Sequence, residues 1–314
     1  GARAAIIGGC SSTACTIAEQ LFNVPAVGTM AHSWIQLFGN EYEAFKAWAK
    51  AYPNNCTFLV DTYNVLKSGV PNAIKVFDEV LKPQGIRPAA IRIDSGDITY
   101  LSKKCRKLLD EAGYSDCKIL VSNSLDEYII RDVLNQGAEI DSFGVCERLI
   151  TAKSEPVFGG VYKLVAVEDN SGDIIPRIKI SENEEKITNP GFKKVYRLFD
   201  KDSHAALVDL IALSDEEINL NEDLEVFDPI HVWKRKTIKN YYARELLIQV
   251  FDKGNLVYNS PSVMDIRKFA LEESTKLWSE TLRFENPHTY YVDLSDGLWN
   301  LKHNLLHRYS NIYK

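Results

Sequence analysis

Short apolar runs alternate with longer stretches of helical spacing in the first half of the chain. The runs are rich in aliphatic residues and are bounded by turn signals, which is typical of strands. In chain order they are Ala5–Ile7, Ala26–Val27, Thr57–Val60, Ala90–Ile93, Ile119–Val121 and Ile140–Phe143. Because strands and helices alternate, and because the strands are almost continuously apolar, the pattern predicts a parallel sheet covered by helices.

Four of the intervening stretches are predicted helices. The first carries Tyr42, Phe45 and Trp48 on one face, and Pro71 stands at a position that favours the first turn of the second. Glycines at 113 and 137 follow the last two, as helix C-caps commonly do. The predicted helices are Glu41–Ala51, Asn72–Leu81, Leu101–Ala112 and Ser124–Asn135.

The pattern changes after about Pro156. Short strands separated by turn signals then follow, which favours antiparallel pairing. We predict strands at Val161–Val165, Arg177–Ile180, Lys194–Leu198 and Ala206–Ile211, and helices at Val263–Phe284 and Leu298–Tyr309. Two domains are therefore expected. Residues 1–155 would hold an α/β barrel with active-site strand ends, and residues 156–314 would complete the barrel and add a β-rich and helical region.

Polar residues follow five successive predicted strands, and this favours a closed barrel over an open doubly wound sheet. A (β/α) barrel builds its active site from the C-terminal ends of many strands, whereas an open sheet concentrates its ligand residues at one switch point. The polar residues concerned are Thr29 with His32, Asp61, Asp94, Ser122 with Asn123, and Gly144. The predicted fold class is α/β: a (β/α) barrel with an additional mixed α+β domain.

Composition and charge narrow the classes of function. Hydrophobic residues make up 45% of the chain and charged residues 25%, which is ordinary for a globular protein. A net charge of −6 without a long basic run argues against a nucleic-acid partner, and no apolar run is long enough to predict a membrane span. The six cysteines form no CxxC pair or zinc-like cluster, so we expect reduced thiols and a cytoplasmic location.

His32 is the sharpest candidate for chemistry. It lies among small and hydroxyl residues in the segment GTMAHS, just after a predicted strand. An imidazole at such a position can transfer a proton or accept a phosphoryl group. The residues alone equally allow a capping or core histidine.

Arg92, Asp94 and Asp61 are candidates for binding charged substrates. Arg92 and Asp94 point to the same side of one strand, and an arginine can hold a carboxylate or phosphate through two hydrogen bonds. Asp61 ends another strand, and two carboxylates at one barrel mouth suit magnesium and pyrophosphate. Asp61 and Asp94 are therefore candidate metal ligands as well as catalytic residues. An internal Arg–Asp pair and a helix-capping Asp61 are the alternatives.

Two glycine-containing segments are candidates for binding phosphate. Glycines after a strand let backbone amides approach a phosphate closely, although such loops are common. The predicted phosphate-binding residues are Gly144, Val145, Cys146, Glu147, Gly159 and Gly160.

Taken together, these motifs resemble the nicotinate phosphoribosyltransferase family of type II phosphoribosyltransferases. The similarity runs along almost the whole chain. Its motifs are GTMAHS at 28–33, DTYN at 61–64, RIDSGD at 92–97, SNSLDE at 122–127, ERLITAKSEPVFGGVYKL at 147–164, NPGFKKVYR at 189–197 and VDLSDGLWNLK at 292–302. The resemblance implies a barrel with irregular closure. It also implies a reaction of NAD salvage, in which nicotinate and phosphoribosyl pyrophosphate give nicotinate mononucleotide and pyrophosphate.

The resemblance further implies roles for the candidate residues. ATP would be a co-substrate, hydrolysed through a phosphohistidine at His32, and Mg²⁺ would accompany pyrophosphate. Thr29 and Arg92, with Ser33 beside them, would bind nicotinate, and Asp61 and Asp94 would lie near the ribose and pyrophosphate. The family's phosphate turn reads Gly-Val-Gly. Cys146 takes its third position, where a side chain would crowd a phosphate and exclude a positive backbone φ.

The resemblance also raises questions about completeness. Family members carry an upstream region with an aromatic residue that stacks on nicotinate, so we expect an incomplete site, a homodimer, and an N-terminal part that could be a separate fragment. Three alternatives remain open. They are a nicotinamide-using enzyme, a quinolinate-using enzyme, and a non-catalytic ligand-binding remnant of the family.

Overall fold

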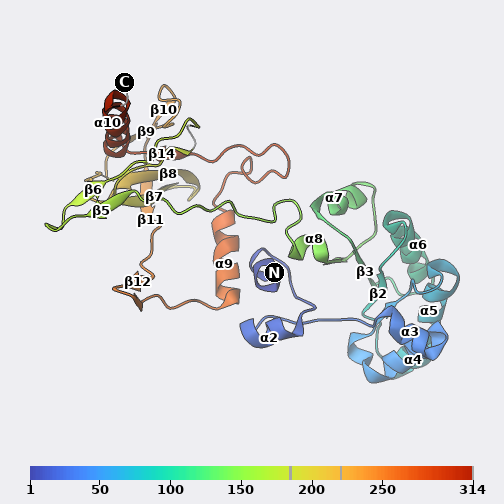
Figure 1. Ribbon diagram of the computed structural model, residues 1–314. Helices are drawn as coiled ribbons and strands as arrows, with labels where there is room; N and C mark the ends of the chain where they lie inside the picture. The colour runs from blue at the N-terminus through green and yellow to red at the C-terminus, as the bar shows by residue number, and fades with distance from the viewer. Residues whose placement is uncertain (184–185, 220, 313–314) are drawn as a thin grey trace. The chain divides into compact units, whose positions relative to one another are not determined.

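The chain divides into two compact units in the computed structural model. The first covers Gly1–Phe158 and the second Gly159–Lys314 (Figure 1). The structure describes residues 1–183, 186–219 and 221–312. Each unit has its own four-stranded sheet.

A parallel sheet of four strands forms the centre of the first unit. Its strands are β1 (Thr57–Leu59), β2 (Ala90–Ile93), β3 (Lys118–Asn123) and β4 (Ser142–Val145), and they are neighbours in chain order. All three pairings are parallel, which confirms the predicted α/β sheet. The described strands of this unit form a single row, and closure into a barrel stays a prediction.

Aromatic side chains fill much of the core beneath this sheet. The ring of Phe58 on β1 stacks on Phe45 at 4.5 Å and on Phe77 at 5.2 Å, and all three side chains are fully buried. Removing such a side chain from water stabilises the fold by roughly 2–3 kcal/mol. The apolar faces read from the sequence thus anchor the helices that support the strand ends.

The helices of the first unit begin at side-chain caps in several places. Asn40 accepts a hydrogen bond from the Glu43 amide at the start of α4, and Asp97 caps α6 in the same way. Asp126 caps α7, so this helix begins three residues after the predicted start at Ser124. The helices are α3 (His32–Phe38), α4 (Glu41–Ala51), α6 (Ile98–Glu111), α7 (Glu127–Asn135) and α8 (Glu147–Ile150).

A continuous helical segment of mixed type links β1 to β2. The predicted helix over 72–81 is confirmed, but it extends in both directions. It comprises η2 (Val65–Gly69) and η3 (Phe77–Leu81), which are π-helical, α5 (Val70–Val76) between them, and the 3₁₀ turn η4 (Lys82–Gln84). Gly69 lies so close to the end of β1 that a Cβ there would be 1.9 Å from the carbonyl oxygen of Val60. No other residue fits this crossing without movement of the backbone.

Two predicted strands of the first unit are wrong. Residues 5–7 belong to the helix α1 (Ala2–Ile7), which holds three alanines, and alanine favours helix. Residues 26–27 form no strand, and Ala26 makes only an isolated parallel bridge with Thr13. The helix α2 (Thr16–Phe22) lies between them in the chain.

A second sheet of four strands organises the second unit. Its order is β11-β7-β8-β14, with β14 parallel to β8 and the other pairs antiparallel. The predicted strands at 194–198 and 206–211 are confirmed. The strands are β7 (Lys193–Asp200), β8 (Ala206–Leu213), β11 (Tyr241–Glu245) and β14 (Val292–Leu294).

Three two-stranded ladders and two helices complete this unit. The helices are α9 (Val263–Ser274) and α10 (Asp296–Ile312). The ladders pair β5 (Ala166–Glu168) with β6 (Ile174–Pro176), β9 (Leu224–Phe227) with β10 (Arg235–Ile238), and β12 (Phe251–Asp252) with β13 (Asn255–Leu256).

Three predicted elements of this unit are displaced or shortened. The strands expected at 161–165 and 177–180 are absent there. Asp169 instead accepts hydrogen bonds from the amides of Ser171 and Asp173, and this tight turn pairs β5 with β6 directly beside it. The helix expected over 263–284 ends at Ser274. No helix within the described residues is long and apolar enough to cross a membrane.

A cluster of ion pairs ties the second sheet to α9. Arg197 on β7 donates to both carboxylate oxygens of Asp209 on β8, at 2.8 and 2.9 Å. Glu273 on α9 binds Arg244 on β11, and it accepts from Lys276 at 2.8 Å. We call these five residues the β7–α9 cluster.

Candidate active site

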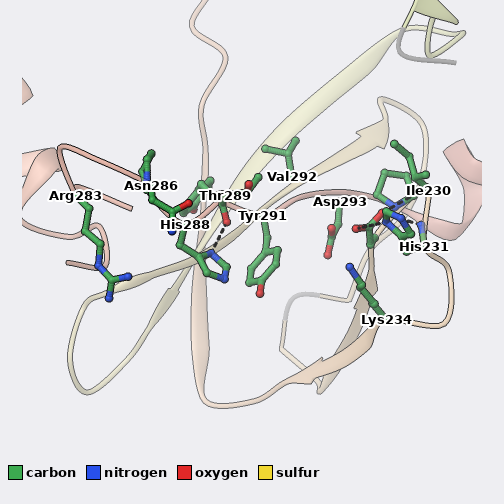
Figure 2. A pocket seen from close by; sticks show the side chains of 14 residues that line it. Ile230, His231, Lys234, Arg283, Asn286, His288, Thr289, Tyr291, Val292 and Asp293 are labelled. Carbon is green, nitrogen blue, oxygen red and sulfur yellow. Dashed lines mark hydrogen bonds and ion pairs between the residues drawn. The ribbon is translucent and has the colours of Figure 1, made fainter. Parts of the chain in front are cut away.

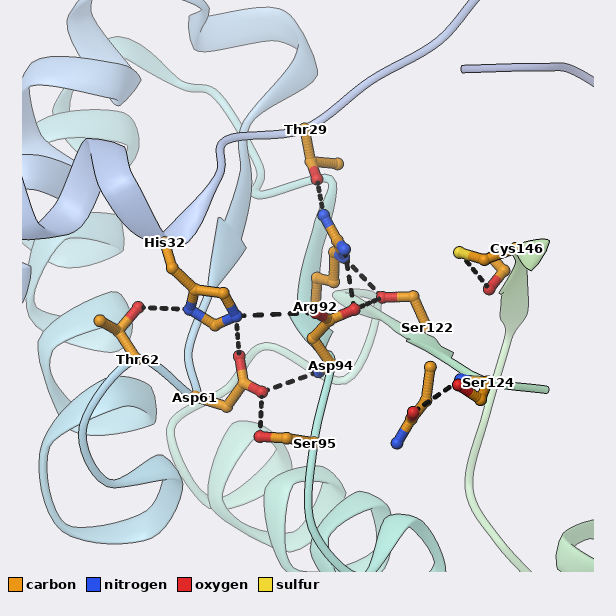
Figure 3. A network of polar contacts seen from close by, with 12 residues as sticks. Thr29, His32, Asp61, Thr62, Arg92, Asp94, Ser95, Ser122, Ser124 and Cys146 are labelled. Carbon is orange, nitrogen blue, oxygen red and sulfur yellow. Dashed lines mark hydrogen bonds and ion pairs between the residues drawn. The ribbon is translucent and has the colours of Figure 1, made fainter. Parts of the chain in front are cut away.

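Arg92 lies at the centre of a polar network at the C-terminal ends of the parallel strands (Figure 3). Its side chain leaves β2 and donates three hydrogen bonds. Nε donates to Ser122 at the end of β3 at 2.7 Å, Nη1 to Thr29 at 2.8 Å, and Nη2 to Asp94 at 2.8 Å. The guanidinium plane is therefore fixed by three different segments of the chain.

Asp94 is held as a carboxylate by this environment. Burial would raise the pKa of Asp94, but the hydrogen bond from Ser122 and the hydrogen bond and charge of Arg92 outweigh it and lower the pKa. Its Oδ1 accepts from both Arg92 and Ser122. Its side chain is still 31% exposed, so a bound molecule can reach it.

Asp61 is the most enclosed carboxylate of the network, with a side chain only 2% exposed. Its Oδ2 accepts from the Asp94 amide at 2.9 Å and from the Ser95 hydroxyl at 2.6 Å. Its Oδ1 is buried and has no hydrogen-bond donor among the described residues. A buried acceptor without a donor is costly, so this oxygen is available to a cation or a ligand.

His32 stands opposite the two carboxylates, at the first position of α3. Its Nδ1 is 3.0 Å from the hydroxyl of Thr62, and its Nε2 is 3.6 Å from Asp94 Oδ2 and 3.9 Å from Asp61 Oδ1. The side chain is 39% exposed. The ring is thus held by protein groups on both nitrogens yet accessible, which suits proton transfer or phosphoryl acceptance.

Asp61 and Asp94 fit a magnesium site of the kind completed by substrate. Within the described ranges, no group of three or more His, Cys, Asp or Glu residues is arranged to hold a metal ion by itself. Mg²⁺ is usually bound through one or two carboxylates together with water and substrate phosphates. Each of the two carboxylates keeps one oxygen outside the protein's hydrogen bonds, and those oxygens are suitable ligands.

The segment after β4, the predicted phosphate turn, has a backbone conformation that does not require glycine at position 146. A Cβ on Gly144 would be 3.1 Å from the Cβ of Ser122, so glycine here allows β4 to pack closely on β3. Cys146 has φ of −105°, and the expected conflict with a positive φ does not arise. The hydrogen bond from Ser124 lowers the pKa of Glu147, which places an anion beside the predicted phosphate position.

The network brings together five of the predicted site residues: Thr29, His32, Asp61, Arg92 and Asp94. Ser33 is exposed on α3. Val145 ends β4 in the first unit, while Gly159 and Gly160 belong to the second. All contacts of the network lie within the first unit, and the two glycines are not among its residues.

Three hydroxyl side chains of the network were not assigned roles from the sequence. They are Thr62, Ser95 and Ser122, and each contacts a predicted site residue. Thr62 and Ser95 directly follow Asp61 and Asp94, and Ser122 comes near the end of the next strand. Hydroxyl residues next to strand-end carboxylates were the signal that could have identified them.

Comparison with known proteins agrees with the motifs. Residues 192–302 match the nicotinate phosphoribosyltransferase C-terminal domain. The chain is 46% identical to nicotinate phosphoribosyltransferase of Bacillus subtilis over 98% of this chain, and 33% identical to that of Dictyostelium discoideum over 96%. The crystal structure of human nicotinic acid phosphoribosyltransferase superposes with a TM-score of 0.75 at 25% identity, covering 97% of this chain and 66% of the human one.

The chain is shorter than these relatives. It spans 62% of the length of the Bacillus protein and 59% of the Dictyostelium protein. Within that span the similarity includes both units, because almost the whole chain is aligned. The chain therefore belongs to the nicotinate phosphoribosyltransferase family and corresponds to about three-fifths of its relatives' length.

Proposed function

We propose that this chain carries the catalytic core of a nicotinate phosphoribosyltransferase. It would join nicotinate to phosphoribosyl pyrophosphate, forming nicotinate mononucleotide and pyrophosphate in cytoplasmic NAD salvage. The observation that carries the proposal is the network in which Arg92 faces Thr29, while Asp61 and Asp94 face His32.

Arg92 is suited to hold the carboxylate of nicotinate. A guanidinium has five N–H groups, and three of those on Arg92 are used by Ser122, Thr29 and Asp94. Among the described contacts, one N–H on each terminal nitrogen remains, and two such donors match a carboxylate in bidentate geometry. The neighbouring Thr29 would then orient the pyridine ring.

Asp61 and Asp94 are suited to stabilise the reacting sugar. The nicotinate nitrogen attacks the anomeric carbon of phosphoribosyl pyrophosphate, the bond to pyrophosphate breaks, and positive charge develops on the ribose. Carboxylates held in advance at that position lower the barrier without reorganisation. The lowered pKa of Asp94 keeps it ionised for this role. Mg²⁺ held by Asp61 and Asp94 would offset the charge of the pyrophosphate.

His32 is proposed to couple the reaction to ATP. One imidazole nitrogen would attack the γ-phosphorus of ATP and release ADP, and water would later cleave the phosphohistidine. A phosphoryl group on His32 would place negative charge beside Asp61 and Asp94, whose free oxygens lie 3.9 and 3.6 Å from Nε2. That repulsion gives a physical reason for the site to change its shape or affinity during the ATP cycle.

Further parts of the proposal concern assembly. The parallel strands β1 to β4 would form one arc of an irregular barrel. Residues 144–147 and Gly159-Gly160 would contribute phosphate contacts. A homodimer and an N-terminal part upstream of this chain would complete the substrate site.

Phosphate transfer from γ-labelled ATP tests the proposal. The experiment uses the chain together with any upstream region, and compares the unmodified protein with His32→Ala and with His204→Asn as a histidine control in the other unit. We expect acid-labile label in the unmodified protein and the control, and none in His32→Ala.

Three results would contradict parts of the proposal. Label that persists in His32→Ala would place the phosphohistidine elsewhere. Formation of nicotinate mononucleotide by a folded protein that takes no label would indicate an ATP-independent transferase. A folded protein without label or product would be a ligand-binding remnant.

A further inference from the structure

A cavity of about 830 Å³ lies entirely within the second unit (Figure 2). Two segments line it, residues 228–234 at the end of β9 and residues 283–293 leading into β14. Pockets of this size hold molecules as large as nucleotides. None of its residues belongs to the network around Arg92.

Asp293 is the unusual residue of this cavity. It lies on β14 and is only 6% exposed, yet no hydrogen bond or ion pair to its carboxylate is found among the described residues. Its oxygens line the cavity rather than being enclosed in the protein. A buried carboxylate without a donor is costly, and most such groups in proteins are paired.

Asp293 also belongs to the motif at 292–302, in which three neighbouring side chains have structural roles. Leu294 and Leu298 are buried, and the Ser295 hydroxyl donates to Glu216. Packing and hydrogen bonding at the start of α10 account for these residues. Neither accounts for an acid that points into a cavity.

The surroundings of Asp293 disfavour its ionised form, so a bound hydrogen-bond donor would stabilise the carboxylate. Burial, and then the charge of Asp228, raise the pKa of Asp293 to about 6. Asp228 itself is satisfied, because it accepts from the amides of Ile230 and His231 and lies 3.2 Å from the imidazole of His231. Asp293 is thus the carboxylate of the pair that still requires an N–H donor at neutral pH.

The same cavity carries cations and an aromatic ring. Lys234 has no ion pair among the described residues, and Arg283 has only a long one, 3.9 Å to Glu280. The side chain of Tyr291 lines the cavity, and the residue is 42% exposed. An acceptor for N–H groups, a ring surface and two cations are therefore present in one space.

We propose that this cavity binds a nucleotide. The N–H edge of the base would donate to Asp293, the base would lie against Tyr291, and the phosphate would meet Lys234, while Arg283 lies at the other end of the cavity (Figure 2). Guanine fits Asp293 better than adenine does, because its pairing edge offers two adjacent N–H donors and an ionised carboxylate only accepts. The inference is independent of the proposed phosphoribosyl transfer, since all its residues lie in the second unit.

Calorimetric titration of the 314-residue chain with guanosine monophosphate at pH 7.5 tests the site. We expect one saturable site, and binding about tenfold or more weaker in Asp293→Asn, since the replacement turns an acceptor toward the base edge into a donor. Lys234→Ala should weaken binding about fivefold through the lost phosphate contact. Lys236→Ala, on the same ladder outside the cavity, should bind like the unmodified chain.

Two further ligands separate the contribution of the phosphate from that of the base. Ribose 5-phosphate should bind weakly, with sensitivity to Lys234→Ala and not to Asp293→Asn, and adenosine monophosphate should bind less tightly than guanosine monophosphate. The proposal fails if guanosine monophosphate does not saturate a site, or if Asp293→Asn binds it equally. Lys234 is exposed, so Lys234→Ala remains informative if Asp293→Asn does not fold, and unchanged binding in Lys234→Ala then also overturns the site.

Discussion

Both units contain an arginine paired with an aspartate, but only in the second unit do these side chains find all their polar partners within the protein. In the β7–α9 cluster, Arg197 directs two nitrogens to Asp209 and the third toward Glu273 at 3.8 Å. Asp209 also accepts from the hydroxyl of Tyr290 at 3.0 Å. Each charged group of the cluster has a partner of opposite charge within the protein.

The network around Arg92 is different. Arg92 keeps unused N–H groups among the described contacts, and Asp61 keeps a buried oxygen without a donor. Buried polar groups are normally satisfied, so such unsatisfied groups mark places where a ligand supplies the missing partner. An Arg–Asp pair therefore indicates a functional site only when it leaves hydrogen-bonding groups without protein partners.

Asp94→Asn should produce the largest effect. The change removes a charge next to the developing ribosyl cation, so we expect kcat to fall roughly 10²–10³-fold, as for other lost electrostatic contacts. Steady-state formation of nicotinate mononucleotide measures it, with Asp110→Asn on α6 as the control. A loss below about threefold would remove Asp94 from the catalytic machinery.

Glu273→Gln should break the complete cluster without affecting catalysis. Arg244 and Lys276 lose their anion and Arg197 keeps only Asp209, so the free energy of unfolding should fall by about 3 kcal/mol at pH 7. The hydrogen bond from Arg244 and the other contacts lower the pKa of Glu273 from 4.5 to about 2. The stabilisation is therefore present above pH 4.5 and is lost as the pH falls toward 2.

Urea unfolding of both proteins between pH 2 and pH 7 measures this difference. The two curves of stability against pH should converge at the acid end. Equal stability at pH 7 would show that the cluster contributes nothing beyond its hydrophobic surroundings.

Arg92→Lys should sharpen the comparison, because it keeps the positive charge and removes the planar guanidinium with its paired N–H donors. Lysine cannot hold a carboxylate through two parallel N–H groups, so the KM for nicotinate should rise about tenfold to a hundredfold. Any activity with nicotinamide should change less, because an amide lacks the carboxylate charge. Equal changes for both substrates would indicate that Arg92 does not read the carboxylate.

Asp293→Asn should have the smallest effect, and it should stabilise the folded protein instead of impairing it. The raised pKa of Asp293, about 6 against 3.8, means that ionisation destabilises the folded state as the pH rises from 3.8 through 6. Asparagine avoids that cost, so the variant should be more stable at pH 8 by roughly 2 kcal/mol and no more stable below pH 3.8. Asp228, His231 and Lys234 line the same cavity and are unchanged in the variant.

Thermal unfolding at pH 8 and pH 3.5, without ligand, measures that difference. A lower melting temperature for Asp293→Asn at pH 8 would mean that the carboxylate has a partner within the protein. Binding of a nucleotide would stabilise the unmodified protein, so its melting temperature would then exceed that of Asp293→Asn.

The strands β1 to β3 and the main site residues could be predicted from the sequence for one reason. Each strand is an apolar run that ends in a polar residue, and parallel strands bring those ends together. The run at 5–7 is not followed directly by such a polar residue, and it forms a helix. Thr62 and Ser122 were not given roles, because their contacts depend on side-chain directions that periodicity does not specify.

The cavity of the second unit could not be predicted in the same way. Its two lining segments are far apart in the chain and have no periodic pattern, and they meet only because β14 pairs with β8 and the 228–234 segment folds back beside it. The shortened helix α9 and the turn at Asp169 likewise depend on caps and local hydrogen bonds. Such features are set by tertiary contacts.

Gly69 has a consequence for anyone who evolves this protein in the laboratory. A methyl group there would lie 1.9 Å from the Val60 carbonyl, and Val60 directly precedes Asp61. In a saturation library scored for turnover, position 69 should therefore be as depleted of variants as His32, although it touches no substrate. Libraries restricted to the residues of the Arg92 network would overlook it, and varying residue 60 would not restore tolerance at 69, because the clash is with the backbone of Val60.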